Sequence, residues 1–304
     1  MSTQKEFCPL VSIGVPAYNS HQYIAQALQS LLMQSYQNLE IFVSDDVSTD
    51  GTWEIIREFV AKDSRIKAIR QPKKLCMMPN FQYVFDETRG DYFMWAGDHD
   101  KWDPDFVTRC VQAFERRPDA VLIVPRSCWI NTEGQVVRED SHQIDTSPAR
   151  SAAERVLLLM QQMVRCNPIY GMYTRTILQE ALPFPEVLSP DCVLIYRVAA
   201  AGNVYTEERT NWYRRITHHE QSSVQSYRRY VRVLPLHGIA ALFPLLICRL
   251  YLLREFIRCH GTLSARWQLL QHGLRRFFLN APQIKLLFHD TFLDKFPKSS
   301  KVNR

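Results

Sequence analysis

Residues 39–52 of the chain read LEIFVSDDVSTDGT, and this stretch decides the fold. Leu39–Val43 has the β-branched and aromatic content of a buried strand, and Asp50-Gly51 is a turn signal. The serine and threonine residues between them are ordinary capping residues of a strand-to-helix loop. Capping does not explain the adjacent Asp45 and Asp46, which together could accept hydrogen bonds from the base or ribose of a nucleotide.

The same strand–loop–helix pattern repeats on either side of this stretch, over roughly the first 125 residues. The expected strands are Leu10–Val15, Leu39–Val43, Ile66–Ile69, Asp91–Ala96 and Ala120–Val124, and the expected helices are Tyr23–Leu32, Trp53–Val60, Asn80–Glu87 and Asp105–Arg116. This alternation predicts an α/β fold, with a mostly parallel sheet that helices cover on both faces. Ligands of such sheets bind beyond the carboxyl ends of the strands.

The pattern changes after the fifth expected strand. An apolar helix is expected over Ser151–Arg165, and a second helix runs from Pro190 to Ala201. A short strand near Asn203–Thr206 and a basic-aromatic segment, Asn211–Ile216, follow. The rest of the chain, from about Tyr227, is expected to be helical.

Composition excludes several classes of protein. The chain has 304 residues, of which 46% are apolar and 22% charged, as in ordinary globular proteins. The sequence contains no uninterrupted apolar run of about 18 residues, the length that marks a clear membrane span. We also expect no secretory signal. The glycine-rich phosphate loops of dehydrogenases and P-loop NTPases are absent from the sequence. The eight cysteines form no CxxC pair, so we expect buried thiols in a reducing compartment, without a zinc or disulfide framework.

The C-terminal part of the chain is basic. Residues 228–304 carry 14 Lys and Arg against 3 Asp and Glu, whereas residues 1–227 carry 23 against 28. The apolar stretch Ile239–Ile257 is interrupted by a proline and by charged residues. We expect an amphipathic helical tail that lies on an anionic membrane surface. A plain helical cap on the body is the alternative, and nucleic acid is not an expected partner.

Asp98-His99-Asp100 is the sharpest local feature of the sequence. It follows a buried strand and precedes a helix, and carboxylates at i and i+2 can face one divalent cation. Mg²⁺ and Mn²⁺ prefer oxygen ligands and often share them with substrate phosphates. A solvated acidic loop is the alternative.

The second half of the sequence offers two further candidates. Asp191 lies just after Ser189-Pro190, at the expected start of a helix, where it either interacts with the helix dipole or serves as a general base that faces the cation. His218 and His219 follow the basic-aromatic segment, and His218 either contacts a metal or diphosphate or is merely solvated.

Taken together, these motifs resemble the inverting family 2 glycosyltransferases of the GT-A fold. The resemblance covers about residues 8–125, with weaker matches near Asp191 and over residues 213–223. Its motifs are PLVSI (9–13), VPAYN (15–19), DDVSTDGT (45–52), GDY (90–92) and the acidic triplet at 98–100. Val47 stands where the family has glycine, and Lys74-Leu75-Cys76 stands where an Asn-x-Gly often occurs.

The resemblance implies a role for each candidate residue. Nucleotide-binding residues would be Pro16, Ala17, Tyr18, Asn19, Asp45, Asp46 and Asp98, and metal ligands would be Asp98, Asp100, His99 and His218. Asp191 would be the catalytic base. The implied cofactor is Mg²⁺ or Mn²⁺. Residues 1–125 would form the nucleotide-sugar half, residues 126–227 the acceptor half, and residues 228–304 the basic tail.

The implied function is sugar transfer from a nucleotide diphosphate sugar, expected to be a UDP-sugar, to an acceptor hydroxyl with inversion. The acceptor would be a saccharide or lipid-linked saccharide of cell-envelope polysaccharide or glycolipid synthesis. The basic tail suggests a cytoplasmic protein held at the inner face of the membrane. The competing hypothesis is a catalytically inactive nucleotide-sugar-binding scaffold at a membrane, and a nucleotidyltransferase is disfavoured because no glycine-rich basic loop follows the first strand.

Overall fold

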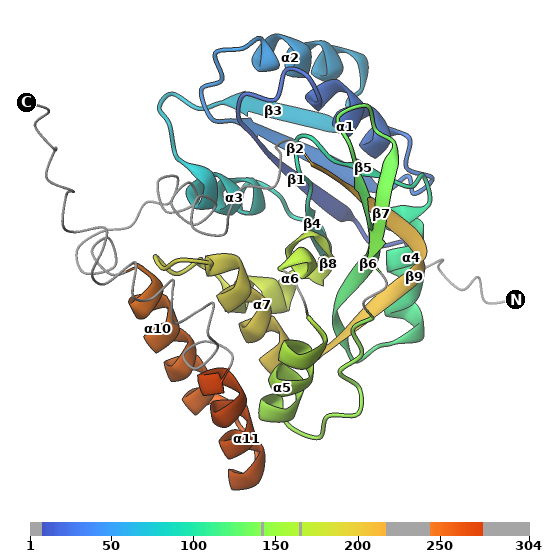
Figure 1. The fold of residues 1–304 in the computed structure, drawn as a ribbon. Coiled ribbons are helices and arrows are strands. Elements are labelled where there is room, and N and C mark those ends of the chain that lie inside the picture. The colour runs from blue at the N-terminus through green and yellow to red at the C-terminus, as the bar shows by residue number, and fades with distance from the viewer. Residues whose placement is uncertain (1–7, 141–142, 164–165, 217–243, 276–304) are drawn as a thin grey trace, which may run out of the picture.

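One sheet runs through most of the chain in the computed structural model, which describes residues 8–140, 143–163, 166–216 and 244–275 (Figure 1). The strand order is β3-β2-β1-β4-β8-β6-β9-β5, and β7 pairs with β6. The strands are β1 (Val11–Ala17), β2 (Leu39–Asp45), β3 (Ile66–Arg70), β4 (Tyr92–Trp95), β5 (Lys101–Trp102), β6 (Ala120–Ile130), β7 (Val136–Asp140), β8 (Met172–Thr174) and β9 (Asn203–Arg215).

The first half of the sheet is parallel, as the sequence predicts. Strands β3, β2, β1 and β4 pair side by side in the same direction. The helices that connect them are α1 (Ile24–Leu32), α2 (Thr52–Lys62) and α3 (Met77–Asp86), and α4 (Phe106–Arg116) follows β5. Because the strands are parallel, the loops after β1, β2 and β4 all leave the same edge of the sheet.

The second half of the sheet is mixed. The short β8 is antiparallel to both β4 and β6, while β6 and β9 are parallel. The segments expected at 203–206 and 211–216 form one continuous strand, β9, with a register shift opposite Pro125 and Arg126. The acidic middle of this strand is tolerated because Glu207 pairs with Arg116 and Arg209.

Helices cover both faces of the sheet, and each face has its own apolar core. One core packs α1, α2 and α4 against residues such as Val11, Ile13 and Met94. The other packs α3, α5 (Ala152–Gln162), α6 (Arg175–Ala181) and α7 (Pro190–Ala201) against residues such as Phe93 and Trp95. Alternate residues of β4 thus serve opposite cores, as a strand buried on both faces requires.

Two helices of the basic tail pack on the second core. α10 (Pro244–Arg258) and α11 (Leu263–Leu274) lie beside α5 and α7 (Figure 1). Cys248, Leu252 and Phe256 of α10 are buried in that core, so this part of the tail does cap the body. Among the described residues, no helix has the length and apolar character needed to cross a membrane.

The expectation that all cysteines are buried thiols is wrong. Cys166 and Cys192 form a disulfide, and Cys8 is exposed. Cys110, Cys128 and Cys248 are buried and free, as expected. The two bonded cysteines are 26 residues apart in sequence, and only the packing of the segment before β8 against α7 brings them together.

Candidate active site

The two carboxylates after β2 are both buried and hold different loops. Both oxygens of Asp46 accept backbone N–H bonds, from Leu75 and Cys76, so this side chain fixes the loop before α3. Asp45 accepts a hydrogen bond from the N–H of Ser48 and lies 3.5 Å from the Arg70 guanidinium. Burial raises the pKa of Asp45, and these two contacts oppose the increase.

The residues at and just after the end of β1 lie beside Asp46. Ala17 is buried and its carbonyl accepts from the Asp46 N–H, whereas Tyr18 is 45% exposed. The Lys74 ammonium lies 3.4 Å from the centroid of the Tyr18 ring. Asn19 accepts a hydrogen bond from the N–H of Thr49 and so ties the loops after β1 and β2 together. An exposed aromatic ring and a cation here suit a nucleotide, whose base can stack and whose phosphates are anionic. Half-buried Pro16 precedes these residues on β1.

The Asp98-His99-Asp100 triplet follows β4, and its three side chains contact one another. His99 lies between the two carboxylates, with Nδ1 2.8 Å from Asp98 Oδ1 and Nε2 3.6 Å from Asp100 Oδ1. Burial opposes protonation of His99, but the charges of Asp100 and Asp98 outweigh it and raise the pKa to about 9. The imidazole is therefore cationic at neutral pH when no other cation is present.

Asp98 and Asp100 differ in their freedom to bind a cation. Asp100 is buried, and its oxygens accept from Trp212 Nε1 at 2.9 Å and from the Arg215 N–H at 2.9 Å. Asp98 accepts from the Tyr18 N–H at 3.0 Å and keeps 13% side-chain exposure. Both Asp98 oxygens are engaged, because Oδ1 lies 2.8 Å from His99 Nδ1, so a cation would have to displace the imidazole from this carboxylate. Mg²⁺ and Mn²⁺ are often held by one or two carboxylates plus substrate phosphates. Of the two carboxylates, Asp98 is the more accessible to a cation, and metal ligation by Asp98, Asp100 or His99 stays a prediction.

Arg215 fixes this loop from β9, and sequence reasoning did not single it out. Its guanidinium donates to the His99 carbonyl at 2.9 Å, to two carbonyls of the loop after β6, and to Gln26 of α1. Gly97 is required on the other side, because a Cβ there would meet Asp100 Oδ2 at 2.7 Å. The position of Asp98 is therefore set by several elements at once.

Asp191 lies in the first turn of α7. Its Oδ1 is enclosed and has no hydrogen-bond partner among the residues that the structure describes. Burial raises the pKa of Asp191 to about 6, although backbone N–H groups and the charge of Arg214 oppose this. A carboxylate with an unused oxygen and a pKa near neutrality has the properties of a general base.

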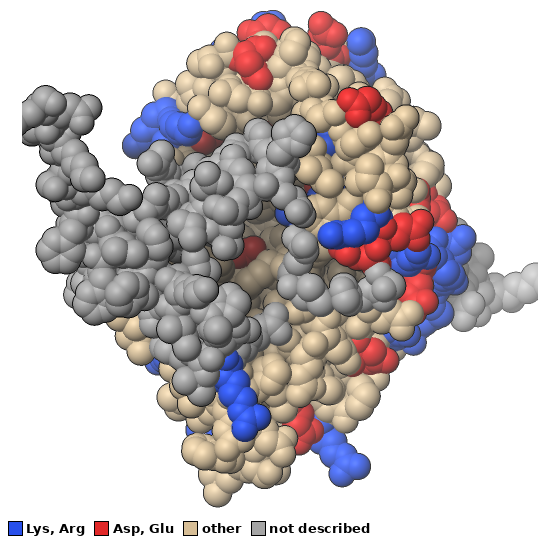
Figure 2. All heavy atoms as spheres, viewed as in Figure 1, with Lys and Arg blue, Asp and Glu red and all other residues tan. Residues whose placement is uncertain are grey.

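Tyr170 connects the two groups of carboxylates. This residue of the 3₁₀ helix Asn167–Tyr170 packs against Trp212 with the two rings tilted by 34° and 4.7 Å between ring centroids. Burial raises the pKa of its hydroxyl, and the charges of Asp100, Asp191 and Asp98 raise it further. The charges of the carboxylates after β4 and of the one on α7 therefore both act on the Tyr170 hydroxyl. Figure 2 shows a hollow near the middle of this face with an acidic side chain at its floor.

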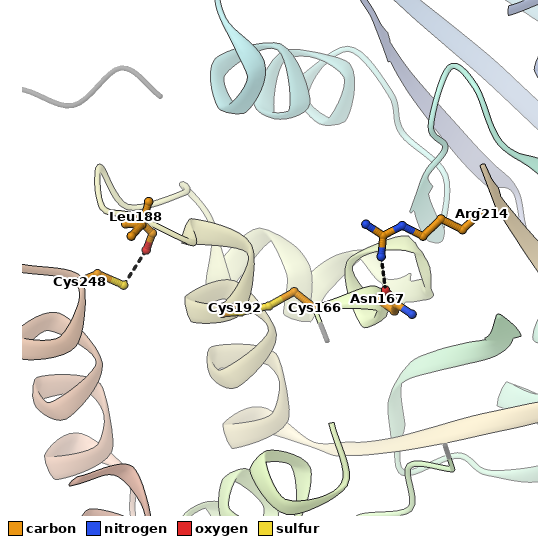
Figure 3. The surroundings of a disulfide bond; sticks show 6 residues. All are labelled: Cys166, Asn167, Leu188, Cys192, Arg214 and Cys248. Carbon is orange, nitrogen blue, oxygen red and sulfur yellow. Dashed lines mark hydrogen bonds between the residues drawn. A yellow bond between two sulfur atoms is a disulfide. The ribbon is translucent and has the colours of Figure 1, made fainter. Parts of the chain in front are cut away.

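The basic-aromatic segment Asn211–Ile216, which supplies Trp212 and Arg215, also contributes Arg214 to this site. Arg214 donates to Asn167 Oδ1 at 3.0 Å (Figure 3), and its charge reaches both His99 and Asp191. Tyr213 instead donates its hydroxyl to Asp103 and contributes to the support of the loop before α4. His218, the remaining predicted ligand, lies outside the described residues.

Comparison with known sequences gives the family. The family model described as glycosyl transferase family 2 matches residues 12–182, more than half of the chain, and the chain therefore belongs to this family. An uncharacterized glycosyltransferase of Haemophilus influenzae is 33% identical over 132 residues, 41% of either chain. A chondroitin synthase of Escherichia coli is 33% identical over 129 residues, 42% of this chain and 19% of the relative.

A third relative is TuaG of Bacillus subtilis, a glycosyltransferase assigned to teichuronic acid biosynthesis. It is 27% identical over 138 residues, 45% of this chain and 51% of the relative. The matched segment thus spans about half or less of the length of these relatives.

Solved structures show the same fold. S. aureus TarS 1–349 in complex with UDP-GlcNAc superposes with a TM-score of 0.66 at 14% identity, covering 92% of this chain and 79% of that one. The mannosyltransferase PcManGT of Pyrobaculum calidifontis, in complex with GDP-Man and Mn²⁺, superposes with a TM-score of 0.52 at 16% identity, covering 95% and 86%. The chain has the GT-A glycosyltransferase fold, as its sequence predicts.

Proposed function

We propose that the protein transfers a sugar from a nucleotide diphosphate sugar to an acceptor hydroxyl, with inversion at the anomeric carbon. The observation that carries the proposal is that the charges of Asp98, Asp100 and Asp191 all raise the pKa of the one Tyr170 hydroxyl, whose ring packs on Trp212, the donor to Asp100. A single in-line displacement needs a donor site and a base close to each other.

The donor half of the site is built by the loops after β1, β2 and β4. The Tyr18 ring and the Lys74 ammonium would receive the base and the diphosphate, and Asp98 would hold the divalent cation. Such a cation, when bound, neutralises the charge that develops on the leaving diphosphate. Arg214 would add a fixed positive charge on the other side, where oriented charges are worth most because the site is partly closed to water.

Asp191 would remove the proton from the acceptor hydroxyl as its oxygen attacks the anomeric carbon. Its elevated pKa supports this role, because a carboxylate with a pKa of about 6 is ionised at neutral pH and yet holds a proton better than an ordinary aspartate. The one step breaks the bond to the diphosphate on the opposite face of the sugar ring and so inverts the configuration.

A UDP-sugar is the proposed donor. In support of this choice, the similarly folded TarS structures contain UDP and UDP-GlcNAc. PcManGT, with GDP-Man, shows that the fold also accepts another base in other proteins. The names of TuaG and chondroitin synthase support a saccharide acceptor, and we propose a role in cell-envelope polysaccharide synthesis.

We also propose that the tail rests on an anionic membrane and keeps the protein at its cytoplasmic face. In α10 and α11, Ile257, Leu263 and Trp267 are 52%, 84% and 61% exposed. Between residues 244 and 275 the chain has five arginines and one glutamate. Apolar side chains next to basic ones are what an interfacial helix presents to anionic lipid.

Vesicle sedimentation tests the membrane proposal. The double variant Leu263→Ser/Trp267→Ser should bind anionic vesicles at least about 30-fold more weakly than the wild type, because about 2 kcal/mol or more of apolar burial is lost. Zwitterionic vesicles should bind both proteins weakly. Equal binding of the variant and the wild type to anionic vesicles would refute the proposal for these helices.

Release of UDP from a panel of UDP-sugars, with and without Mn²⁺ or Mg²⁺, tests the main proposal. An active transferase releases UDP with one or a few sugars, faster with the cation and with acceptor. Tight UDP-sugar binding without any release would favour the inactive scaffold instead, a reading to which His99 between two carboxylates gives some support.

A further inference from the structure

A disulfide lies at the start of the helix that carries Asp191. Cys166 directly precedes the 3₁₀ helix Asn167–Tyr170, and Cys192 lies in the first turn of α7 (Figure 3). Their Cα atoms are 5.7 Å apart, an ordinary disulfide separation. The bond therefore joins the helix that carries Tyr170 to the helix turn that carries Asp191.

The two sulfur atoms are close to the proposed base itself. A carboxylate oxygen of Asp191 and the Sγ atoms of Cys166 and Cys192 all lie within 4.8 Å of one another. In the disulfide form neither sulfur has a proton to donate, and Asp191 Oδ1 has no hydrogen-bond partner in the described part of the chain. A change at these sulfurs thus acts directly on the surroundings of the base.

Few hydrogen bonds hold the start of α7, and its other contacts are apolar, since Leu188, Pro190 and Val193 are buried. Its N-cap, Ser189, has a left-handed backbone (φ 54°) and makes no side-chain cap hydrogen bond. Pro190 at the first helical position has no N–H to donate. Outside the disulfide, Figure 3 shows the thiol of Cys248 on α10 bonded to the carbonyl of Leu188. The disulfide joins this turn covalently to the segment before the 3₁₀ helix Asn167–Tyr170.

We propose that Cys166 and Cys192 form a reversible redox modification site that sets the position of Asp191, so that the disulfide form is the more active one. The proposal rests on the proposed function and names a means of regulating the same site. Cys166 and Cys192 are positioning residues here, because they act through Asp191 and do not contact the reacting atoms.

The chemistry is thiol–disulfide exchange with a low-molecular-weight disulfide. The two thiols lose two protons and two electrons and become one S–S bond, and the oxidant's S–S bond is reduced to two thiols. Cys166 and Cys192 are both partly exposed, so a small disulfide or thiol can reach them. In reducing compartments such bonds are usually transient and serve catalysis or redox sensing.

Reduction should slow the chemical step and leave donor binding intact. Without the bond, the turn that carries Asp191 is held only by contacts that are not covalent, so the carboxylate spends less time in reach of the acceptor hydroxyl. Misplacement of a catalytic group by about 1 Å can cost about 100-fold in rate. The loops after β1, β2 and β4 are built by other contacts and keep the donor.

The test uses the full chain in glutathione buffers that range from reducing to oxidising. Differential alkylation and mass spectrometry measure the fraction of the Cys166–Cys192 bond, and kcat and the Kd for UDP are measured in the same buffers. We expect kcat to rise about tenfold or more with the oxidised fraction, while the Kd for UDP stays constant.

Single variants separate the disulfide from other thiol effects. Cys166→Ser and Cys192→Ser should both have the low kcat of the reduced enzyme in every buffer, with an unchanged Kd for UDP that shows the donor half is folded. Cys8→Ser is the matched control, because Cys8 is exposed and unbonded, and it should respond like the wild type.

Amide hydrogen exchange over residues 188–195 provides a readout that does not need turnover. The first turn of α7 should exchange faster in the reduced protein and in both variants. The proposal is overturned if the pair never oxidises in these buffers, or if the bond forms while kcat and exchange stay the same. Loss of turnover in every form, with exchange that still follows the bond, would count against the proposed function alone.

Discussion

The loop after β4 and the start of α7 both carry a carboxylate of the proposed site, but they are built in opposite ways. Asp100 has hydrogen bonds to both oxygens, and Arg215 fixes the adjacent His99 carbonyl from a third element. Asp191 has an enclosed oxygen without a described partner, and its helix begins without a side-chain cap.

The difference in hydrogen bonding suits Asp100 to a structural role and Asp191 to a reactive one. A carboxylate whose lone pairs are engaged stabilises the fold and has little left for a substrate proton. An enclosed carboxylate oxygen without a partner costs stability, because the charged form is poorly solvated, and such a cost is tolerated where the group has chemistry to perform. The contrast supports the proposal that the loop after β4 holds the donor and that Asp191 takes the proton.

The largest effect is expected from Asp191→Asn. The amide cannot accept the acceptor's proton, so kcat should fall by about 10²–10⁴-fold. The Kd for UDP should not change, because the donor loops are untouched. Steady-state rates together with calorimetric titration of UDP provide the measurement, and full turnover in the variant would remove Asp191 from the role of base.

For Asp100→Asn we expect the main effect on stability, whereas for Asp191→Asn we expect it on turnover. The amide nitrogen cannot accept from Trp212 Nε1 or the Arg215 N–H, and one buried donor is left unpaired. The free energy of unfolding should fall by about 2–3 kcal/mol in urea titrations. Asp191→Asn is the matched control, and at pH 7 it should be as stable as the wild type or more so. Equal destabilisation of the two variants would contradict the structural role of Asp100 that distinguishes it from Asp191.

The pH dependence of the rate sharpens the role of Asp191. The base must be ionised, so kcat/KM should fall tenfold per pH unit below the pKa of about 6. An ordinary aspartate would put this limb near pH 4. A pH profile from 4.5 to 8 on a reactive UDP-sugar distinguishes the two, and a flat profile down to pH 5 would contradict the elevated pKa.

The same shift predicts how stability changes with pH. Because the folded pKa of Asp191 lies above the unfolded value, the folded state binds more protons between about pH 4 and pH 6. The stability contributed by this residue therefore falls as pH rises through that window. Urea titrations of the wild type and Asp191→Asn at pH 5 and pH 7 should differ in this sense.

The smallest effect is expected from Val47→Gly in the donor half. Val47 has a φ of 62°, a left-handed backbone that a β-branched residue rarely adopts, and the family's glycine is suited to it. Relief of about 1–2 kcal/mol of strain is offset by the greater entropy of glycine in the unfolded chain. We expect a gain of less than about 1 kcal/mol in the free energy of unfolding, and a clear loss would mean that the side chain packs usefully.

The strands and helices before β5 are readable from sequence because each has a periodic apolar pattern. β5, with two residues, and β8, with three, are too short for any period. β7 has four exposed residues of five, so no alternation marks it. The middle of β9 is acidic, and only Arg116, on a distant helix, and Arg209 show why it can be a strand.

In the candidate site, too, some residues can be predicted from the sequence and others cannot. Asp98, Asp100 and Asp191 stand in local motifs and can be found without a structure. Arg215 cannot, because its partners come from three separate segments. The pairing of Cys166 with Cys192 depends on tertiary packing alone.

A structure of the protein with an unreactive UDP-sugar analogue, a divalent cation and an acceptor saccharide tests the central claim most directly. We expect the diphosphate beside Asp98 and the Asp191 carboxylate within about 2.6–3.2 Å of an acceptor hydroxyl, or one water away, on the opposite face of the anomeric carbon. A donor bound elsewhere, or an Asp191 carboxylate that faces no acceptor, would contradict it.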